Sequence, residues 1–321
     1  MMGEQARTYA VIGTGAVGGF YGARLVEAGC SVHFLLHSDF DHVMRNGLIV
    51  ESPLGDATLV NGKFSGGFHQ STSSLPDCDF VLVALKTTQN HLLGNLLPPL
   101  VTERATVVML QNGLGVEAEA AAIVGGDKVV GGMCFLCSNK VEPGHIRHLD
   151  YGLITLADYG PDGAGRGITE PMRFLAEDFG RAGIPISLEE DLLSSRWKKL
   201  VWNIPFNGLS VVLDATTEEL MAREETRDLA TALIEEVVMG ASACGATIPS
   251  GYASQMVQST GAMKPYLTSM KLDADAGRPL EIDTMYARPL RAASAAGVEL
   301  PLIEMLYRQL AFIDARSSST P

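Results

Sequence analysis

Three polar residues with acid–base and hydrogen-bonding potential recur at intervals of four: Lys199, Asn203 and Asn207. Residues four apart share one face of an α-helix, so a helix over residues 191–207 would align them in a single polar stripe. All seven histidines precede residue 149, which leaves lysines and carboxylates as the acid–base candidates of the C-terminal part. A solvated helix surface is the alternative, but Trp202 and Phe206 on the neighbouring stripe favour a polar stripe that faces a cleft.

Glu281 is the carboxylate candidate of this part of the chain. It follows Arg278-Pro279-Leu280, and proline is suited to the first turn of a helix. Carboxylates at Glu281 and Asp283 would also interact favourably with the positive end of that helix. A purely structural role at a helix start and a role in binding a ligand are both open for Glu281.

A glycine-rich turn typical of dinucleotide-binding proteins lies near the N-terminus. The motif GTGAVG, residues 13–18, follows an apolar run over residues 9–12 and precedes a helical pattern over 20–28. A second apolar run at 32–36 completes a βαβ unit. Glycines let the backbone approach a pyrophosphate, and the helix N-terminus supplies N–H donors. We expect these residues to bind a dinucleotide cofactor: Gly13, Gly15, Ala16, Val17 and Gly18.

The end of the second predicted strand bears on the choice between NAD and NADP. An acidic residue there typically holds the ribose hydroxyls of NAD, whereas a basic residue accommodates the 2′-phosphate of NADP. His37 and Ser38 could hold that phosphate, helped by Arg45, and Asp39 could instead hold the ribose. Both alternatives are open at this point.

Lys86 and Asn112 each follow a buried apolar strand. In open α/β sheets, ligands bind just beyond the carboxyl ends of the strands, so both residues are binding candidates. A surface lysine is the alternative for Lys86, and a turn-forming residue is the alternative for Asn112.

The pattern along the chain predicts an α/β fold with two domains. Strands are expected at residues 48–50, 57–60, 80–85, 106–110, 128–135, 151–156 and 184–187, with helices at 89–97, 115–124 and 169–182. After about residue 190 only helical patterns remain, at 191–207, 217–244, 251–259, 279–296 and 301–314. We therefore expect a Rossmann-type dinucleotide-binding domain over 1–190 and an all-helical C-terminal domain over 191–321.

Composition excludes several classes of protein. The 321 residues carry a net charge of −13, which is unfavourable for binding nucleic acid through its phosphates. No apolar run is long enough to span a bilayer, and the N-terminus lacks a signal-peptide pattern, so we expect a cytoplasmic protein without membrane association. Cys134 and Cys137 lie in a predicted strand, where residues three apart point to opposite faces, and no second CxxC exists; we expect no metal site.

Five motifs, in order and spacing, resemble the family of 2-dehydropantoate 2-reductases, also called ketopantoate reductases: GTGAVGG, LKTTQ, QNGLG, WKKLVWNIPFN and SMKLDADAGRPLEID. The resemblance extends from about Tyr9 to about Tyr307. It implies reduction of 2-dehydropantoate to (R)-pantoate with NADPH, a step towards pantothenate and coenzyme A, at a site between the two domains. Reduction of a different small 2-keto acid and a non-catalytic NADP-binding sensor are the alternatives.

The resemblance also implies roles for individual residues. Lys199 would be the general acid, Asn203 and Asn207 would align the substrate, and Asn112 would hold it from the cofactor side. The polar groups of the substrate would be bound by Ser269 and Glu281, and the nicotinamide side would be lined by Lys86 and Gln89.

The sequence departs from the family pattern at two positions. His37 replaces an arginine that often holds the NADP phosphate, which leaves NAD as the alternative cofactor. Thr217 replaces a substrate-binding asparagine, which leaves the identity of the keto acid open. The expected partners are the cofactor and a small keto acid, and association into a homodimer is left open. Because cofactor and substrate are anions and the chain is acidic, local cationic and N–H groups must bind them.

Overall fold

The computed structural model describes residues 6–317 and divides into two compact units, each with its own apolar core. The first unit extends to Gln111 and resumes over Val116–Leu192. The second unit begins at Leu193 and includes Asn112–Gly115, a segment that the sequence places within the first domain. The expected fold class, an α/β dinucleotide-binding part followed by a helical part, is confirmed.

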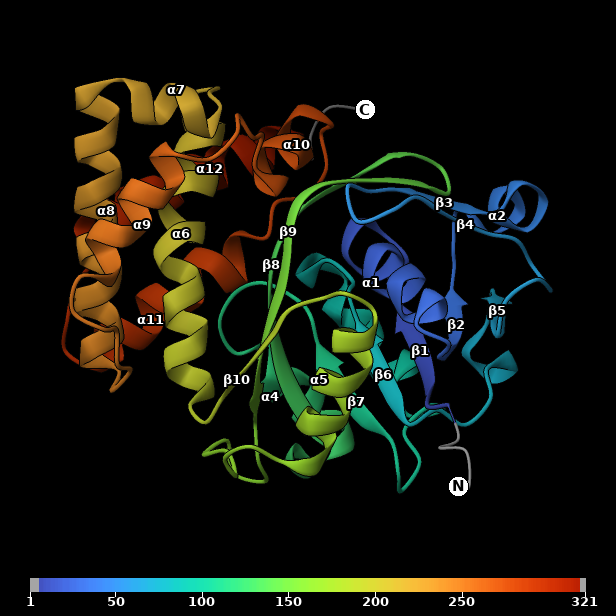
Figure 1. Cartoon of the computed structure of the whole chain (residues 1–321). Coiled ribbons are helices and arrows are strands. Elements are labelled where there is room, and N and C mark those ends of the chain that lie inside the picture. Colours follow the sequence, from blue (N-terminus) through green and yellow to red (C-terminus); the bar gives the residue numbers. More distant parts are fainter. Residues whose placement is uncertain (1–5, 318–321) are drawn as a thin grey trace. The chain divides into compact units, whose positions relative to one another are not determined.

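Within the described residues, the first unit is built on a ten-stranded sheet (Figure 1). Its strands are β1 (Thr8–Ile12), β2 (Ser31–Leu35), β3 (Leu48–Glu51), β4 (Ala57–Leu59), β5 (Gly66–His69), β6 (Phe80–Val83), β7 (Thr106–Met109), β8 (Val129–Glu142), β9 (His145–Asp158) and β10 (Ile186–Glu189). The spatial order is β4-β3-β9-β8-β7-β6-β1-β2-β5, with β10 beside β9. Strands β8 and β9 form a long antiparallel hairpin, and the series from β8 to β5 is parallel.

Two layers of helices cover this sheet because its central strands are apolar on both faces. Tyr9 and Val11 of β1 belong to the core under α1 (Ala16–Glu27) and α5 (Glu170–Arg181). Ala10 and Ile12 belong to the core under α3 (Leu93–Leu96) and α4 (Val116–Val124). Strands β1, β6 and β7 are parallel neighbours, so their carboxyl ends lie next to one another.

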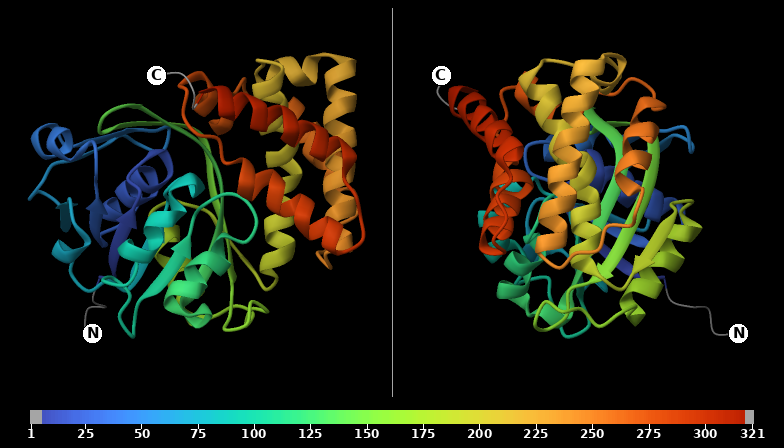
Figure 2. Two further views of the ribbon diagram at one scale, coloured as in Figure 1. Left: turned by 180° about the vertical axis from the view of Figure 1, so that it is seen from behind. Right: turned by 90° about the vertical axis from the view of Figure 1, so that its left-hand side faces the viewer.

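The second unit contains only helices among its described residues. They are α6 (Leu192–Val212), α7 (Thr217–Ala222), α8 (Glu224–Ala243), α9 (Tyr252–Gly261), α10 (Ser269–Asp275), a π-helical turn (Asp283–Ala287), α11 (Arg288–Ala295) and α12 (Pro301–Ser317). Helix α8 contacts α7, α9, α11 and α12, and Figure 2 shows the same helices from two further sides. Trp197 and Ile204 of α6 are fully buried in the core of this unit.

Several predicted elements differ from the observed ones. The helix expected over 217–244 is two helices, because the backbone of Arg223 between them is extended. A capping box at Thr216 and Glu219 starts the first of them, α7. The helix expected over 279–296 is replaced by the π-helical turn and α11, where Pro289 cannot donate to the helix ladder. The helix expected over 89–97 is a 3₁₀ helix (Thr87–Leu92) followed by α3.

Helix α2 (Phe40–Asn46) and strand β5 of the first unit were not predicted. Helix α2 is short and mostly exposed, so it lacks a strong apolar period. Strand β5 contains Gly66, whose positive φ and close approach to Val32 exclude any side chain, and glycine in a sequence argues against a strand.

No helix among residues 6–317 is long and apolar enough to cross a membrane.

Candidate functional site

The glycine-rich turn between β1 and α1 brings the backbone into close contact with neighbouring elements. Gly13 has a φ of +94°, and a Cβ there would lie 2.6 Å from the Leu85 nitrogen, beyond the end of β6. A Cβ on Gly18 would collide with the Gly13 carbonyl and lie 2.9 Å from Val11. These two glycines are therefore required by the turn and by the packing of α1 on β1.

Gly15 differs from both neighbours because its missing side chain faces open space. No atom lies within 4 Å of a Cβ built on Gly15. The residue is the N-cap of α1, and no acidic side chain lies in the first turn of that helix. The first N–H groups of a helix have no partner within the helix, so Ala16, Val17 and Gly18 present donors at its positive end. This arrangement fits the pyrophosphate of a dinucleotide.

The end of β2 lies beside this turn, because Thr14 Oγ1 donates to the Leu35 carbonyl at 3.0 Å. His37 and Ser38 follow β2 and are exposed. Arg45 Nε donates to the Asp41 carbonyl at 2.9 Å within α2. The exposed pair at 37 and 38 can accept a ligand at this end of β2.

Asp39 does not serve as the exposed ribose-binding acid that the sequence left open. Its side chain is buried; Lys140 Nζ lies 2.5 Å from Oδ2, which also accepts from the Gly144 backbone N–H at 2.9 Å. Burial alone would raise the pKa of this carboxyl, but the bonds from Lys140 and Gly144 hold it below its ordinary value. Asp39 therefore attaches the end of β2 to the tip of the β8–β9 hairpin.

Lys86 and Gln89 follow β6 and are exposed, and Lys86 is the N-cap of the 3₁₀ helix. This segment is held by a side-chain network that was not predicted from the sequence. Gln111 Nε2 donates to the Leu85 carbonyl at 2.9 Å and to Asn90 Oδ1 at 2.6 Å. The only sequence signal for Gln111 was its position directly after a buried strand, which it shares with Asn112.

In the second unit, α6 is continuous through Pro205 and carries the polar stripe. Lys199 is 8% exposed, and Asn203 and Asn207 are each 2% exposed. A stripe buried to this degree is not a solvated helix surface, so that alternative is excluded. Buried polar groups interact more strongly with a ligand than exposed ones do, because water competes less.

Asn112 joins this stripe, although it follows β7 in sequence. Asn203 Nδ2 donates to Asn112 Oδ1 at 3.4 Å. The next residue, Gly113, has a φ of +93°, and a Cβ there would lie 2.5 Å from Thr284 Oγ1. Leu114 N–H donates to the Thr284 carbonyl at 2.9 Å. A turn-forming role for Asn112 is thus accompanied by a direct contact with the α6 stripe.

Asn207 links the stripe to the start of α10. Its Oδ1 accepts from the Met270 N–H at 3.4 Å, and its Nδ2 lies 4.0 Å from the Met285 sulfur. Ser269 is the half-buried first residue of α10, adjacent to that contact. Glu281 is 4% exposed and precedes the π-helical turn that contains Met285.

Thr217 is 1% exposed, so it is not available at a surface. Its N–H and its Oγ1 both donate to the Tyr266 carbonyl, at 3.2 and 3.3 Å. This residue therefore holds the segment before α10 in place.

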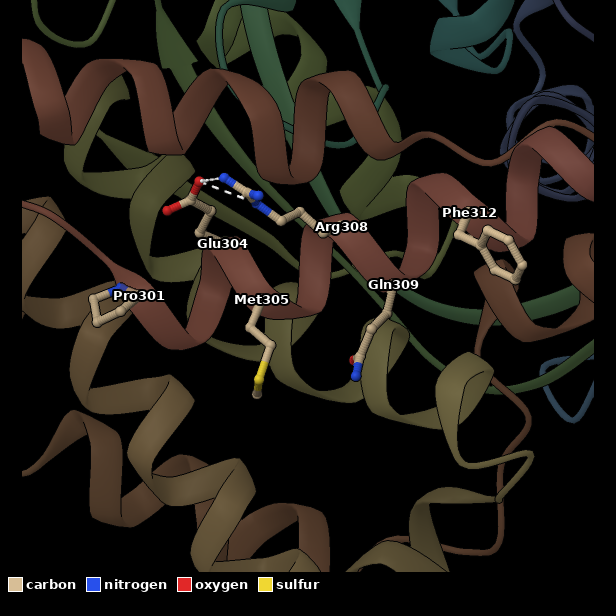
Figure 3. A pocket seen from close by; sticks show the side chains of 6 residues that line it. All are labelled: Pro301, Glu304, Met305, Arg308, Gln309 and Phe312. Atoms are coloured by element: carbon tan, nitrogen blue, oxygen red, sulfur yellow. Dashed lines mark hydrogen bonds and ion pairs between the residues drawn. The ribbon is translucent and has the colours of Figure 1, made fainter.

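A groove along α12 contains none of the predicted site residues. Figure 3 shows its lining side chains, from Pro301 to Phe312, with Glu304 and Arg308 joined by an ion pair of 2.5 Å. Phe312 is 63% exposed there. The groove is separate from the polar stripe of α6.

Comparison with known proteins places this architecture among reductases. The family model "Ketopantoate reductase PanE/ApbA" matches residues 9–161, and its C-terminal model matches residues 191–314. The 2-dehydropantoate 2-reductase of Nostoc sp. is 53% identical over 313 residues, covering 97% of this chain and 96% of the relative.

Two solved structures share the fold of this chain. The 2-dehydropantoate 2-reductase from Geobacter metallireducens GS-15 has a TM-score of 0.88 and 40% identity, covering 95% of this chain and 99% of the other. D-mandelate dehydrogenase with NADH and anilino(oxo)acetate has a TM-score of 0.84 at 19% identity, covering 98% of this chain and all of the other, which shows a common fold.

Proposed function

This chain belongs to the ketopantoate reductase PanE/ApbA family, and on that premise we propose that it reduces 2-dehydropantoate to (R)-pantoate with NADPH. It is an oxidoreductase that acts on a CH–OH group. The observation that carries the proposal is the constellation of the buried Lys199 and Asn203 with the half-buried Asn112, which adds a proton donor and two carboxamides to a dinucleotide-binding fold.

The cofactor would be held by the turn and the end of β2. The N–H groups of Ala16, Val17 and Gly18 would bind its pyrophosphate, with Gly15 allowing close approach. The exposed Lys86 and Gln89 would lie on the nicotinamide side. When bound, the nicotinamide supplies a hydride to the keto carbon.

Preference for NADPH over NADH is supported by the burial of Asp39 and its ion pair with Lys140. An acid that holds NAD ribose must face the ligand, and a free carboxylate would repel a 2′-phosphate. Here the Asp39 charge is balanced by Lys140 and its side chain is buried. The phosphate would then be held by His37 and Ser38, with Arg45 from α2. NAD remains the alternative cofactor because none of these groups is an arginine at the end of β2.

Lys199 would act as the general acid. As hydride adds to the keto carbon, negative charge develops on the carbonyl oxygen, and the ammonium group of Lys199 transfers a proton to it. The C–H and O–H bonds of the alcohol are formed, and the resulting amine regains a proton from solvent. Because Lys199 is 8% exposed, its stabilisation of the developing charge is weakly screened by water.

The remaining polar residues would orient the substrate. Asn203 and Asn112 would align the keto acid, and Asn207 would act from the α10 side. The hydroxyl and carboxylate groups of the substrate would be bound by Ser269 and Glu281. The correct geometry of these groups raises the rate by fixing the carbonyl relative to both hydride and proton donors.

Steady-state assays of 2-dehydropantoate with NADPH and with NADH test this proposal. Lys199→Ala should lower kcat by about 10²- to 10⁴-fold, the usual contribution of a positioned general acid. Lys198→Ala is the matched control, because Lys198 is the adjacent lysine on the same helix but lies on the other stripe. Near full turnover by Lys199→Ala would refute its role as the acid.

A panel of small 2-keto acids tests the second candidate function, reduction of a different substrate on the same site. The observation that favours it is Thr217, which bonds to the Tyr266 carbonyl where the family pattern has a substrate-binding asparagine. Higher kcat/KM for another keto acid than for 2-dehydropantoate would select this alternative. Cofactor binding without turnover of any keto acid would instead indicate a sensor.

A further inference from the structure

We infer that Arg288 is a positioning residue of the active site: it clamps the loop Asn112–Gly115 and thereby holds Asn112 against Asn203. The inference rests on the proposed function only in so far as Asn112 is taken to hold the substrate. Arg288 is the first residue of α11 and follows the π-helical turn directly. No motif of the family resemblance includes it.

The guanidinium of Arg288 contacts two carbonyls of the loop. Its Nη1 lies 3.2 Å from the Gly115 carbonyl oxygen and 3.4 Å from that of Leu114. In the same loop, the Leu114 N–H donates to the Thr284 carbonyl at 2.9 Å. The loop is therefore attached through both its donor and its acceptor groups to one short stretch, residues 284–288.

Asp283 orients this guanidinium. Its Oδ2 accepts from Arg288 Nε at 2.8 Å, and its Oδ1 accepts from Arg291 Nη2 at 2.9 Å. Burial by itself would raise the pKa of the Asp283 carboxyl, but the two arginines hold it below its ordinary value, so it stays ionised at neutral pH. Arg288 has 25% side-chain exposure and Arg291 has 65%, so the first is the more enclosed partner.

The loop needs such a clamp because its own backbone is permissive. Gly113 and Gly115 have φ values of +93° and +75°, a region in which glycine is not confined by a side chain. Glycine loses more conformational freedom on ordering than other residues do. Bonds from outside the loop must therefore supply the order, and the Asn112–Asn203 contact at 3.4 Å depends on it.

Arg288→Met should lower kcat/KM for the keto acid by about tenfold, which corresponds to the loss of one hydrogen bond from a charged group. Arg291→Met is the matched control. It removes a more exposed cation that pairs with the same carboxylate through Asp283 Oδ1, and it should change kcat/KM less than twofold. Arg288→Lys keeps a charge beside Asp283 without the planar fork and should show an intermediate loss.

The double variant with Asn112→Ala distinguishes positioning from general destabilisation. If Arg288 acts through Asn112, Arg288→Met should have no further effect on kcat/KM in the Asn112→Ala background. Multiplicative losses would overturn the inference, as would equal losses in Arg288→Met and Arg291→Met. If Arg288→Met fails to fold, Arg288→Lys enters the same cycle.

Hydrogen exchange of the Leu114 amide provides a readout that does not depend on activity. Its exchange should be accelerated in Arg288→Met and unchanged in Arg291→Met, whatever substrate the enzyme uses. An unchanged exchange rate in Arg288→Met would overturn the clamp itself. An inactive wild-type enzyme with accelerated exchange in Arg288→Met would instead refute the proposed function and leave the clamp supported.

Discussion

Replacing Gly15 by alanine should separate cofactor binding from folding. Gly13 and Gly18 cannot carry a side chain without collisions within the protein, whereas no atom lies within 4 Å of a Cβ on Gly15. The φ and ψ of Gly15, −99° and −157°, are also accessible to alanine. A large effect of Gly15→Ala on cofactor binding at unchanged stability would therefore arise from a ligand in that space.

The effects of Gly15→Ala on the free energy of unfolding and on the free energy of cofactor binding can be estimated separately. Alanine at an N-cap is less favourable than glycine by several tenths of a kcal/mol to about 1, while reduced freedom of the unfolded chain offsets about 0.4–1 kcal/mol. The free energy of unfolding should thus change by less than about 1 kcal/mol. A methyl group that prevents one charge-assisted hydrogen bond to the pyrophosphate would cost about 1.5–3 kcal/mol of binding, or about 10- to 150-fold in Kd.

Fluorescence titration with NADPH measures the Kd, and urea unfolding measures the stability of the same variants. Gly180→Ala is the matched control, because Gly180 lies in helix α5 and also has open space at its Cβ. It should raise stability by about 0.5–1 kcal/mol without changing the Kd. Gly18→Ala should lower stability by about 1–3 kcal/mol, as overpacking does.

An unchanged Kd in Gly15→Ala would refute the assignment of this space to the pyrophosphate. A large loss of stability in Gly15→Ala would show that the open space is closed in the folded protein. Either result would remove the observation on which the cofactor assignment rests.

Lys140→Met should remove the cationic partner of Asp39 and lower the preference for NADPH over NADH by about tenfold. The ratio of the kcat/KM values measured with the two cofactors gives this preference. An unchanged ratio would refute the role of the Asp39–Lys140 pair. Burial lowers the pKa of His148 below its ordinary value of 6.5, so the folded state binds fewer protons than the unfolded state. The free energy of unfolding should be full above pH 6.5 and decline as the pH falls through the folded-state pKa. Thermal unfolding curves of His148→Gln should show a flatter decline. Glu281→Ala should raise the KM for the keto acid about tenfold if the carboxylate binds substrate, whereas a lowered melting temperature at unchanged KM would assign it to the helix start alone.

Local sequence patterns determined the βαβ unit near the N-terminus and the polar face of α6. The glycine turn lies between an apolar run and a helical period, and the βαβ unit follows from that order alone. The four-residue spacing of Lys199, Asn203 and Asn207 requires only a continuous helix to place them on one face, and α6 is such a helix. These inferences hold because they depend on residues within one or two turns of each other.

Other features were ambiguous in the sequence because capping and packing compete with periodicity. A single helical period ran across Arg223, but the backbone is extended at this residue, which ends α7 and caps the start of α8. Gly66 argued against a strand, yet β5 pairs with β2 because a glycine is what the close approach to Val32 requires. At Gly66 the tertiary contact with β2 overrode local propensity.

The sequence by itself determined the type of fold, the glycine-rich turn between β1 and α1 and the polar stripe on α6. Only the tertiary structure decided the partners of residues far apart in the chain. It pairs Asp39 with Lys140 and places Asn112 against Asn203, and it holds the loop after Asn112 with Arg288. Spacing carries no information about such contacts, because they arise where strands and helices from distant segments pack together.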